Sequence, residues 1–207
     1  MPEEEGVDSS LEKAGDKDTI RAELRNVRAA MDVNEWKSGS CLIAEKTVQL
    51  PEFRRAGSVM LYLCMSERRE VDTAPLISRI AAERGIRMYI PFSCGKDLCA
   101  VPFGKDDPVV SGRFGQPEPV YHEAGVQEMP DIVIVPAVAV DREGRRLGYG
   151  KGYYDRFVSG LREQDGNPLV IAFVFSFQLL DVLPQDPWDE RLDCIVTEKE
   201  VIRISKP

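Results

Sequence analysis

The feature that most constrains the fold is the apolar run at residues 132–140, which reads IVIVPAVAV. A run of this kind is typical of a strand buried on both faces of a sheet, because such a strand offers no face to water. It is much shorter than the roughly 20 apolar residues that a transmembrane helix needs. We therefore predict a buried strand over residues 131–140, with Pro136 inside it, and expect no membrane span.

Helical and strand patterns alternate around this run. Apolar residues recur at helical spacing from Ile20 to Met31, while short β-branched runs bounded by glycine, proline or charge are typical of strands. We expect helices from residue 18 or 19 to about 31 and over 34–49, 73–84 and 152–162, with strands over 58–64, 86–92, 98–103, 131–140, 169–175 and 193–197. This order predicts an α/β fold, a single domain with a mostly parallel sheet covered by helices on both faces.

The two parts of the chain without a clear pattern receive different interpretations. Residues 1–16 are polar and are predicted to form a disordered N-terminal tail, which leaves 17–207 as the folded domain. Residues 104–130 are rich in glycine, proline and charge and form a long excursion; loops of that length in compact domains are often functional.

Composition excludes several classes of function. The formal net charge is −8, and no basic stripe with interleaved aromatics is present, so we expect neither nucleic-acid nor membrane binding. The acidic N-terminus has no apolar stretch behind it, which predicts a cytoplasmic protein. Five cysteines without a C-x-x-C pair indicate reduced thiols, and a single histidine, His122, excludes histidine-rich metal sites.

Residues 145–156, RRLGYGKGYYDR, carry most of the chemistry. They follow the buried strand, at the edge where open α/β sheets bind ligands. Alternating glycines let backbone N–H groups approach a phosphate, and the helix that follows points its N-terminus at the same place. Asp155 could hold Mg²⁺ that arrives with a nucleotide. The alternative is a tight strand-to-helix turn with solvated arginines.

The motif R-x-G-x-G-x-G-Y-Y-D-R after this strand resembles the signature of the 5-formyltetrahydrofolate cyclo-ligase family. Other segments resemble the family in the same order along the chain. They are the basic pair Lys17 and Arg21, the segment 70–73 (EVDT), the pair Glu118 and Pro119, and Asp189 ahead of the last strand. The similarity extends from about residue 17 to the C-terminus.

The resemblance implies an ATP- and Mg²⁺-dependent ligase of one-carbon metabolism. Its reaction closes 5-formyltetrahydrofolate, with or without a polyglutamate tail, to 5,10-methenyltetrahydrofolate through a phosphorylated formyl oxygen, and releases ADP and phosphate. The expected partners are ATP and the folate, and we expect a monomer.

The resemblance also implies roles for single residues. ATP is expected to bind Lys17, Arg21, Arg146, Leu147, Gly148, Tyr149, Gly150, Lys151, Gly152, Tyr153 and Tyr154. The folate is expected to meet Leu63, Glu70, Tyr149, Gly150, Lys151, Gly152 and Tyr153. The catalytic residues would be Arg146, Lys151 and Tyr153, and the metal ligands Asp155 and Asp189.

Departures from the family pattern keep other hypotheses open. Trp188 stands where a histidine is common, Lys151 where glycine is common, and residues 66–69 form a longer segment than in some members. A protein that acts on another heterocycle, or one that binds nucleotide or folate without catalysis, remains an alternative. Without the resemblance, Lys17 and Arg21 would be a solvated basic face, and Asp155 a carboxylate that interacts with a helix dipole.

Overall fold

A computed structural model describes residues 16–82, 85–120, 129–164 and 166–205. The predicted tail therefore lies outside the described residues except for Asp16, and so does His122. Within these ranges no helix combines the length and the apolar character that crossing a membrane requires.

The centre of the described fold is a seven-stranded sheet in the order β12-β11-β9-β6-β1-β2-β3. The pairs from β11 to β2 are all parallel, whereas β12 and β3 pair antiparallel at the two edges. The strands are β1 (Ser58–Met60), β2 (Arg87–Cys94), β3 (Asp97–Pro102), β6 (Ile132–Pro136), β9 (Leu169–Phe173), β11 (Cys194–Val196) and β12 (Val201–Arg203). The prediction of a mostly parallel α/β sheet is confirmed.

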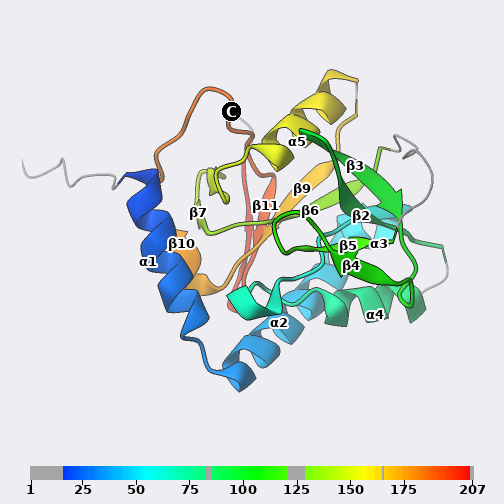
Figure 1. Cartoon of the computed structure of the whole chain (residues 1–207), viewed down its shortest axis with the longest axis horizontal. Helices are drawn as coiled ribbons and strands as arrows, with labels where there is room; N and C mark the ends of the chain where they lie inside the picture. The colour runs from blue at the N-terminus through cyan, green and yellow to red at the C-terminus, as the bar shows by residue number, and fades with distance from the viewer. Residues whose placement is uncertain (1–15, 83–84, 121–128, 165, 206–207) are drawn as a thin grey trace, which may run out of the picture.

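Helices cover both faces because alternate residues of each central strand point to opposite sides. Ile132 and Ile134 belong to one buried cluster, whereas Val133 and Val135 belong to another. The first cluster includes side chains of α2 (Val33–Val48), α3 (Pro51–Arg55) and α4 (Ala74–Ala82), and the second includes those of α5 (Tyr153–Glu163). Figure 1 shows α5 on one side of the sheet with α2 and α4 on the other.

The predicted strand over residues 131–140 is in fact two strands in two sheets. β6 ends at Pro136, and β7 (Ala139–Asp141) joins β8 (Arg146–Leu147) and β10 (Leu179–Leu180) in a small second sheet. Proline has no N–H to continue a ladder. The buried Asp141 carboxylate then accepts hydrogen bonds from the backbone N–H groups of Glu143, Arg145 and Leu183. These bonds hold the turn that leads into residues 148–152, the glycine-rich segment.

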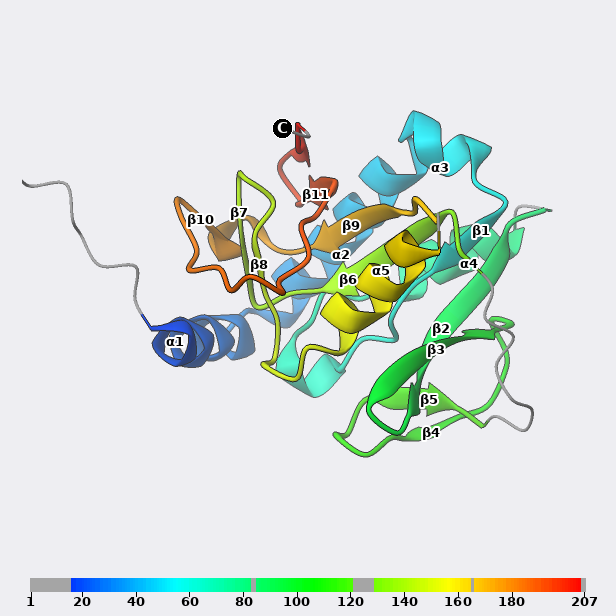
Figure 2. The same cartoon turned by 90° about the horizontal axis from the view of Figure 1, so that it is seen from above.

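Helix α1 (Lys17–Ala29) packs on this second sheet through Ile20, which clusters with Ala139, Leu147 and Leu183. Figure 2 shows α1 beside β7 and β8. The packing brings the N-terminal basic pair to the segment after β8, although more than a hundred residues separate them in the sequence.

The predicted excursion 104–130 contains a two-stranded hairpin of β4 (Val109–Ser111) and β5 (Pro117–Pro119). Its residues 121–128 lie outside the described residues. Two short 3-10 helices, η1 (Ser66–Arg68) and η2 (Ser176–Gln178), complete the described elements.

The interpretation of five reduced thiols is wrong for one pair, because Cys94 and Cys99 form a disulfide across the β2–β3 hairpin. The register places Cys99 opposite Phe92 and Cys94 opposite Asp97, so the two cysteines are diagonal neighbours on one face. Their Cα atoms are 6.1 Å apart, a separation that a disulfide spans.

We expect thiol titration of the denatured, unreduced protein to find three thiols per chain, those of Cys41, Cys64 and Cys194. Titration after reduction should find all five. Five thiols before reduction would show that the hairpin carries no disulfide.

Candidate functional site

One cavity of about 260 Å³ is lined by every residue to which the family resemblance assigns a binding, catalytic or metal role. It lies where β1, β2 and β6 end, the edge at which parallel sheets of α/β folds bind ligands. Its lining includes Lys17, Arg21, Leu63, Glu70, Arg146, Leu147, Gly148, Tyr149, Gly150, Lys151, Gly152, Tyr153, Tyr154, Asp155 and Asp189. Residues from α1, η1 and the glycine-rich segment thus meet in one place.

The glycine-rich segment passes close under α1. Arg21 Nε donates to the Gly148 carbonyl over 2.9 Å, and a Cβ on Gly150 would lie 3.4 Å from the Arg21 guanidinium carbon. Gly150 also has φ +86°, a conformation that other residues rarely adopt. Gly152, with φ +65°, is the N-cap of α5, so the first N–H groups of that helix face the cavity end of the loop.

One end of the cavity is rich in charge. Lys17 Nζ lies 2.7 Å from both the Asp186 and the Asp189 carboxylates. Burial lowers the pKa of Lys17, but the hydrogen bonds and charges of these aspartates outweigh it, and the pKa is raised. On the other side of the glycine-rich segment, Arg146 Nη2 lies 2.8 Å from Asp155 Oδ1, and both side chains are largely buried. The cations are the groups that a polyphosphate needs, and each is already neutralised by a carboxylate.

The two predicted metal ligands, Asp155 and Asp189, both line the cavity, and Asp155 contacts the residue that follows Asp189. The Glu190 N–H, next to Asp189, donates to Asp155 Oδ1 over 3.4 Å. Carboxylate oxygens suit Mg²⁺, which commonly takes only one or two of them and completes its shell with phosphate and water oxygens. Among the described residues, no group of three or more histidine, cysteine, aspartate or glutamate side chains is placed to hold a metal ion.

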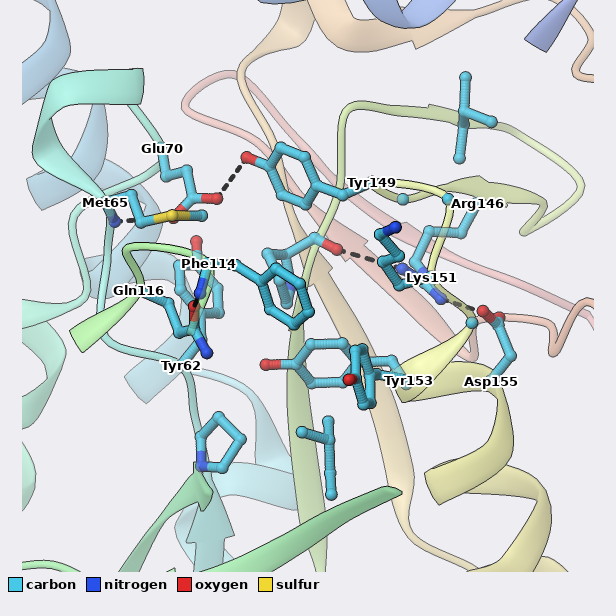
Figure 3. A pocket seen from close by; sticks show the side chains of 18 of the residues that line it. Tyr62, Met65, Glu70, Phe114, Gln116, Arg146, Tyr149, Lys151, Tyr153 and Asp155 are labelled. Carbon is cyan, nitrogen blue, oxygen red and sulfur yellow. Dashed lines mark hydrogen bonds and ion pairs between the residues drawn. The ribbon is translucent and has the colours of Figure 1, made fainter. Parts of the chain in front are cut away.

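The other end of the cavity combines apolar side chains with two buried acids, Glu70 and Glu118. Glu70 Oε2 accepts from Met65 N over 2.7 Å, and Tyr149 Oη donates a short hydrogen bond to Glu70 Oε1. Burial raises the pKa of Glu70, while hydrogen bonds from Tyr149 and Met65 act in the opposite direction. Figure 3 shows Glu70 and Met65 across the cavity from Arg146 and Asp155, with Tyr149 between them. An apolar wall with a few polar groups that point into the cavity is typical of a small-molecule pocket.

Aromatic side chains close the cavity between these ends. The rings of Phe114 and Tyr153 have centroids 6.0 Å apart, and Lys151 Nζ lies 6.0 Å from the Phe114 ring centre. Arg68 donates to the Phe114 carbonyl, which ties η1 to the turn of the β4–β5 hairpin. Tyr154, the second residue of α5, packs instead against the buried cluster on this side of the sheet, and burial raises its pKa.

Sequence reasoning missed some of the residues that form the site. Arg28 contacts Tyr149, while Phe114, Gln116, Glu118 and Asp186 line the cavity. The sequence analysis names Glu118 as part of a family motif but predicts no role for it. Asp186 stands near Asp189 in the sequence, and that pairing is the signal that could have identified it.

The chain is similar in sequence to known proteins along most of its length. The sequence profile of the 5-formyltetrahydrofolate cyclo-ligase family matches residues 13–198. A probable 5-formyltetrahydrofolate cyclo-ligase of Schizosaccharomyces pombe is 30% identical over 200 residues, which cover 90% of this chain and 97% of that protein. The Escherichia coli cyclo-ligase is 29% identical over 184 residues, 86% of this chain and 98% of that protein.

Solved structures show the same fold. The structure of 5,10-methenyltetrahydrofolate synthetase from Aquifex aeolicus superposes with a TM-score of 0.78 at 32% identity, covering 92% of this chain and 94% of that one. A synthetase from Mycoplasma pneumoniae, at 24% identity and a TM-score of 0.68, covers 89% of this chain and 99% of that one and has a similar fold.

Proposed function

The chain belongs to the 5-formyltetrahydrofolate cyclo-ligase family, and we propose that its cavity closes 5-formyltetrahydrofolate to 5,10-methenyltetrahydrofolate with ATP as the phosphate donor. The observation that carries this proposal is that one cavity contains two ends of different chemistry. A glycine-rich, cationic end suits a polyphosphate, and an end where apolar side chains surround the buried acid Glu70 suits a flat heterocycle.

The chemistry explains why both halves are needed. The formyl group is amide-like, so its oxygen leaves poorly. Transfer of the γ-phosphoryl group to that oxygen, with release of ADP, makes it a good leaving group. N10 then attacks the formyl carbon and loses its proton, and phosphate departs as the second C–N bond forms. The protein must mainly hold the two substrates in line and neutralise the moving charge.

At the phosphate end, Lys17, Arg21 and the backbone of residues 146–154 would bind ATP. Arg146 and Lys151 would neutralise charge on the transferred group, since both line the cavity beside the glycine-rich segment. Asp155 and Asp189 would hold Mg²⁺, which supplies positive charge to the phosphate oxygens when it is bound.

At the heterocycle end, Glu70 would accept hydrogen bonds from neighbouring ring N–H and amino groups of the pterin. An ionised carboxylate is an acceptor with two oxygens, which suits two adjacent donors. Leu63 would form an apolar wall. Tyr149 and residues 150–152 would meet the folate, and Tyr153 would contact it beside the reacting groups, where it already meets Phe114.

Absorbance in the methenyltetrahydrofolate band tests the function directly. We expect a rise only when protein, ATP, Mg²⁺ and 5-formyltetrahydrofolate are all present. A flat trace from folded protein that binds ATP would reject the cyclo-ligase activity, and turnover with another heterocycle alone would reject the substrate.

Lys17→Ala is expected to raise the KM for ATP about tenfold, the effect of one lost charge-assisted hydrogen bond, while the KM for the folate changes much less. The reason is its place at the charged end, between Asp186 and Asp189. Steady-state kinetics with each substrate varied in turn measures both constants. Lys37→Ala, at an exposed position of α2, serves as the control. A larger change in the folate constant would contradict the assignment of Lys17.

A further inference from the structure

Arg28 is a buried arginine that none of the proposed roles uses. It lies in the last turn of α1, and only 2% of its surface is exposed. Its Nε donates to the Arg68 carbonyl over 2.8 Å, its Nη1 to the Ala137 carbonyl over 3.2 Å, and its Nη2 to Tyr149 Oη over 2.6 Å. Burying a guanidinium is costly unless its donors are satisfied, so this position demands an explanation.

The hydrogen-bond chemistry of Arg28 fixes the direction of one proton. A guanidinium group only donates, so Tyr149 Oη must accept in this contact. The single hydroxyl proton of Tyr149 is then left for the other partner of that oxygen, Glu70 Oε1. Burial, followed by the nearby Glu70 charge, raises the pKa of Tyr149 to about 12, which keeps this proton in place.

The hydroxyl proton of Tyr149 helps to fix the orientation of the Glu70 carboxylate. Tyr149 donates to Oε1 and Met65 N donates to Oε2, so each carboxylate oxygen is held by one donor. Two donors on different oxygens fix the plane of the carboxylate. Each oxygen has further lone-pair capacity, and Glu70 lines the cavity, so the fixed carboxylate can accept from a bound heterocycle.

We propose that Arg28 is a positioning residue for substrate selection, which acts through Tyr149 to hold Glu70 as an oriented acceptor for a heterocycle that presents two adjacent N–H donors. This inference rests on the proposed function, in which that heterocycle is the pterin. Arg28 does not touch the substrate. Its role is to make Glu70 favour a ring edge of two donors over one that carries acceptors.

Arg28 also joins α1 to η1 and to the segment after β6, so its loss could weaken the fold as well. Tyr149→Phe separates the two roles, because it removes the hydroxyl and leaves both carbonyl contacts of Arg28 intact. Arg25 supplies a matched control. Its guanidinium carbon lies 5.9 Å from the Tyr149 ring centre, the same distance as that of Arg28, but its side chain is exposed.

The experiment compares Arg28→Met, Tyr149→Phe, the double variant and Arg25→Met. We expect Arg28→Met and Tyr149→Phe each to raise the KM for 5-formyltetrahydrofolate about tenfold while the KM for ATP changes less than about twofold. The double variant should be no worse than the more impaired single variant, because both changes break one chain of contacts. Arg25→Met should match the wild type.

Other results would overturn the inference. Equal changes in both KM values, or additive effects in the double variant, would make Arg28 a purely structural residue. Equilibrium binding of 5-formyltetrahydrofolate without ATP separates this from failure of the proposed function. A wild type that binds the folate but does not convert it rejects the cyclo-ligase activity, and the variants still test Arg28 by affinity. A wild type that does not bind it rejects both.

Discussion

Glu70→Gln is expected to lower kcat/KM for 5-formyltetrahydrofolate about 100-fold, because an amide replaces a charged acceptor and weakens two charge-assisted hydrogen bonds. The amide would present one donor and one acceptor where the pterin edge would offer two donors. The KM for ATP should change little, since Glu70 lies at the opposite end of the cavity from Arg146 and Asp155 (Figure 3).

The same substitution should remove the loss of stability that ionisation of Glu70 causes in the wild type as pH rises. Burial raises the pKa of Glu70 above 4.5, so the folded state binds its proton more tightly than the unfolded state does. Below the unfolded pKa the group is protonated in both states and burial has no ionic cost. As pH rises through that value and up to the raised folded pKa, the wild type loses stability, whereas the glutamine variant does not.

Thermal melts from pH 4.5 to 8 test this. The difference in Tm between Glu70→Gln and the wild type should be smallest at the lowest pH and should reach a plateau once the folded carboxyl is ionised. Glu45→Gln, on the exposed face of α2, is the control. A variant that is equally active, or a difference that shrinks as pH rises, would contradict the assigned role of Glu70.

Asp155→Asn is expected to reduce turnover on the order of 100-fold or more, the size of effect seen when one group that stabilises transition-state charge is removed. The variant should also need more Mg²⁺ to reach its maximal rate. In addition, Asp155 pairs with the buried Arg146, so a loss of about 1–3 kcal/mol of stability should accompany the change. Kinetics across Mg²⁺ concentrations and denaturant unfolding measure the two effects separately.

Asp97→Asn is the matched control. Asp97 forms an exposed ion pair with Arg156, which lies next to Asp155 in α5. An exposed pair contributes about 0–1 kcal/mol, so this variant should resemble the wild type. If Asp155→Asn keeps its turnover and its Mg²⁺ dependence but unfolds more easily, Asp155 has only the pairing role and the metal assignment fails.

The fold was predictable wherever the pattern is local. The alternating order of helices and strands and the buried β6 follow from apolar spacing, and α2 and α5 begin and end within a residue or two of the predicted limits. The strands predicted over 58–64 and 169–175 are longer than β1 and β9, because the chain leaves the ladder after Met60 and Phe173 while remaining apolar. Apolar spacing cannot distinguish a buried strand from a buried segment that follows it.

The site was predictable through its motifs and not through its contacts. Lys17 and Asp189 both appeared as candidates, but nothing in the sequence indicates that they pair across the chain. Arg28 could not be identified as a site residue from the sequence, because the helix that contains it has other arginines and such a helix face is usually solvated. Only the packing of α1 on the second sheet turns it inward. The β7–β8–β10 sheet was missed for a similar reason, since its strands are only two or three residues long.

The ion pairs at the charged end have a consequence for how ligands enter. Lys17 already binds Asp186 and Asp189, so an anion that binds Lys17 competes with two carboxylates, and each carboxylate that it displaces is released. The released carboxylates then need a new counter-charge, which favours the arrival of a cation with the anion. Ligand binding would thus replace ion pairs between side chains of the protein by ion pairs with the bound anion and its cation. Because ion pairs within the protein would be exchanged for ion pairs with the ligand, nucleotide affinity should depend on ionic strength less than the local charge density implies.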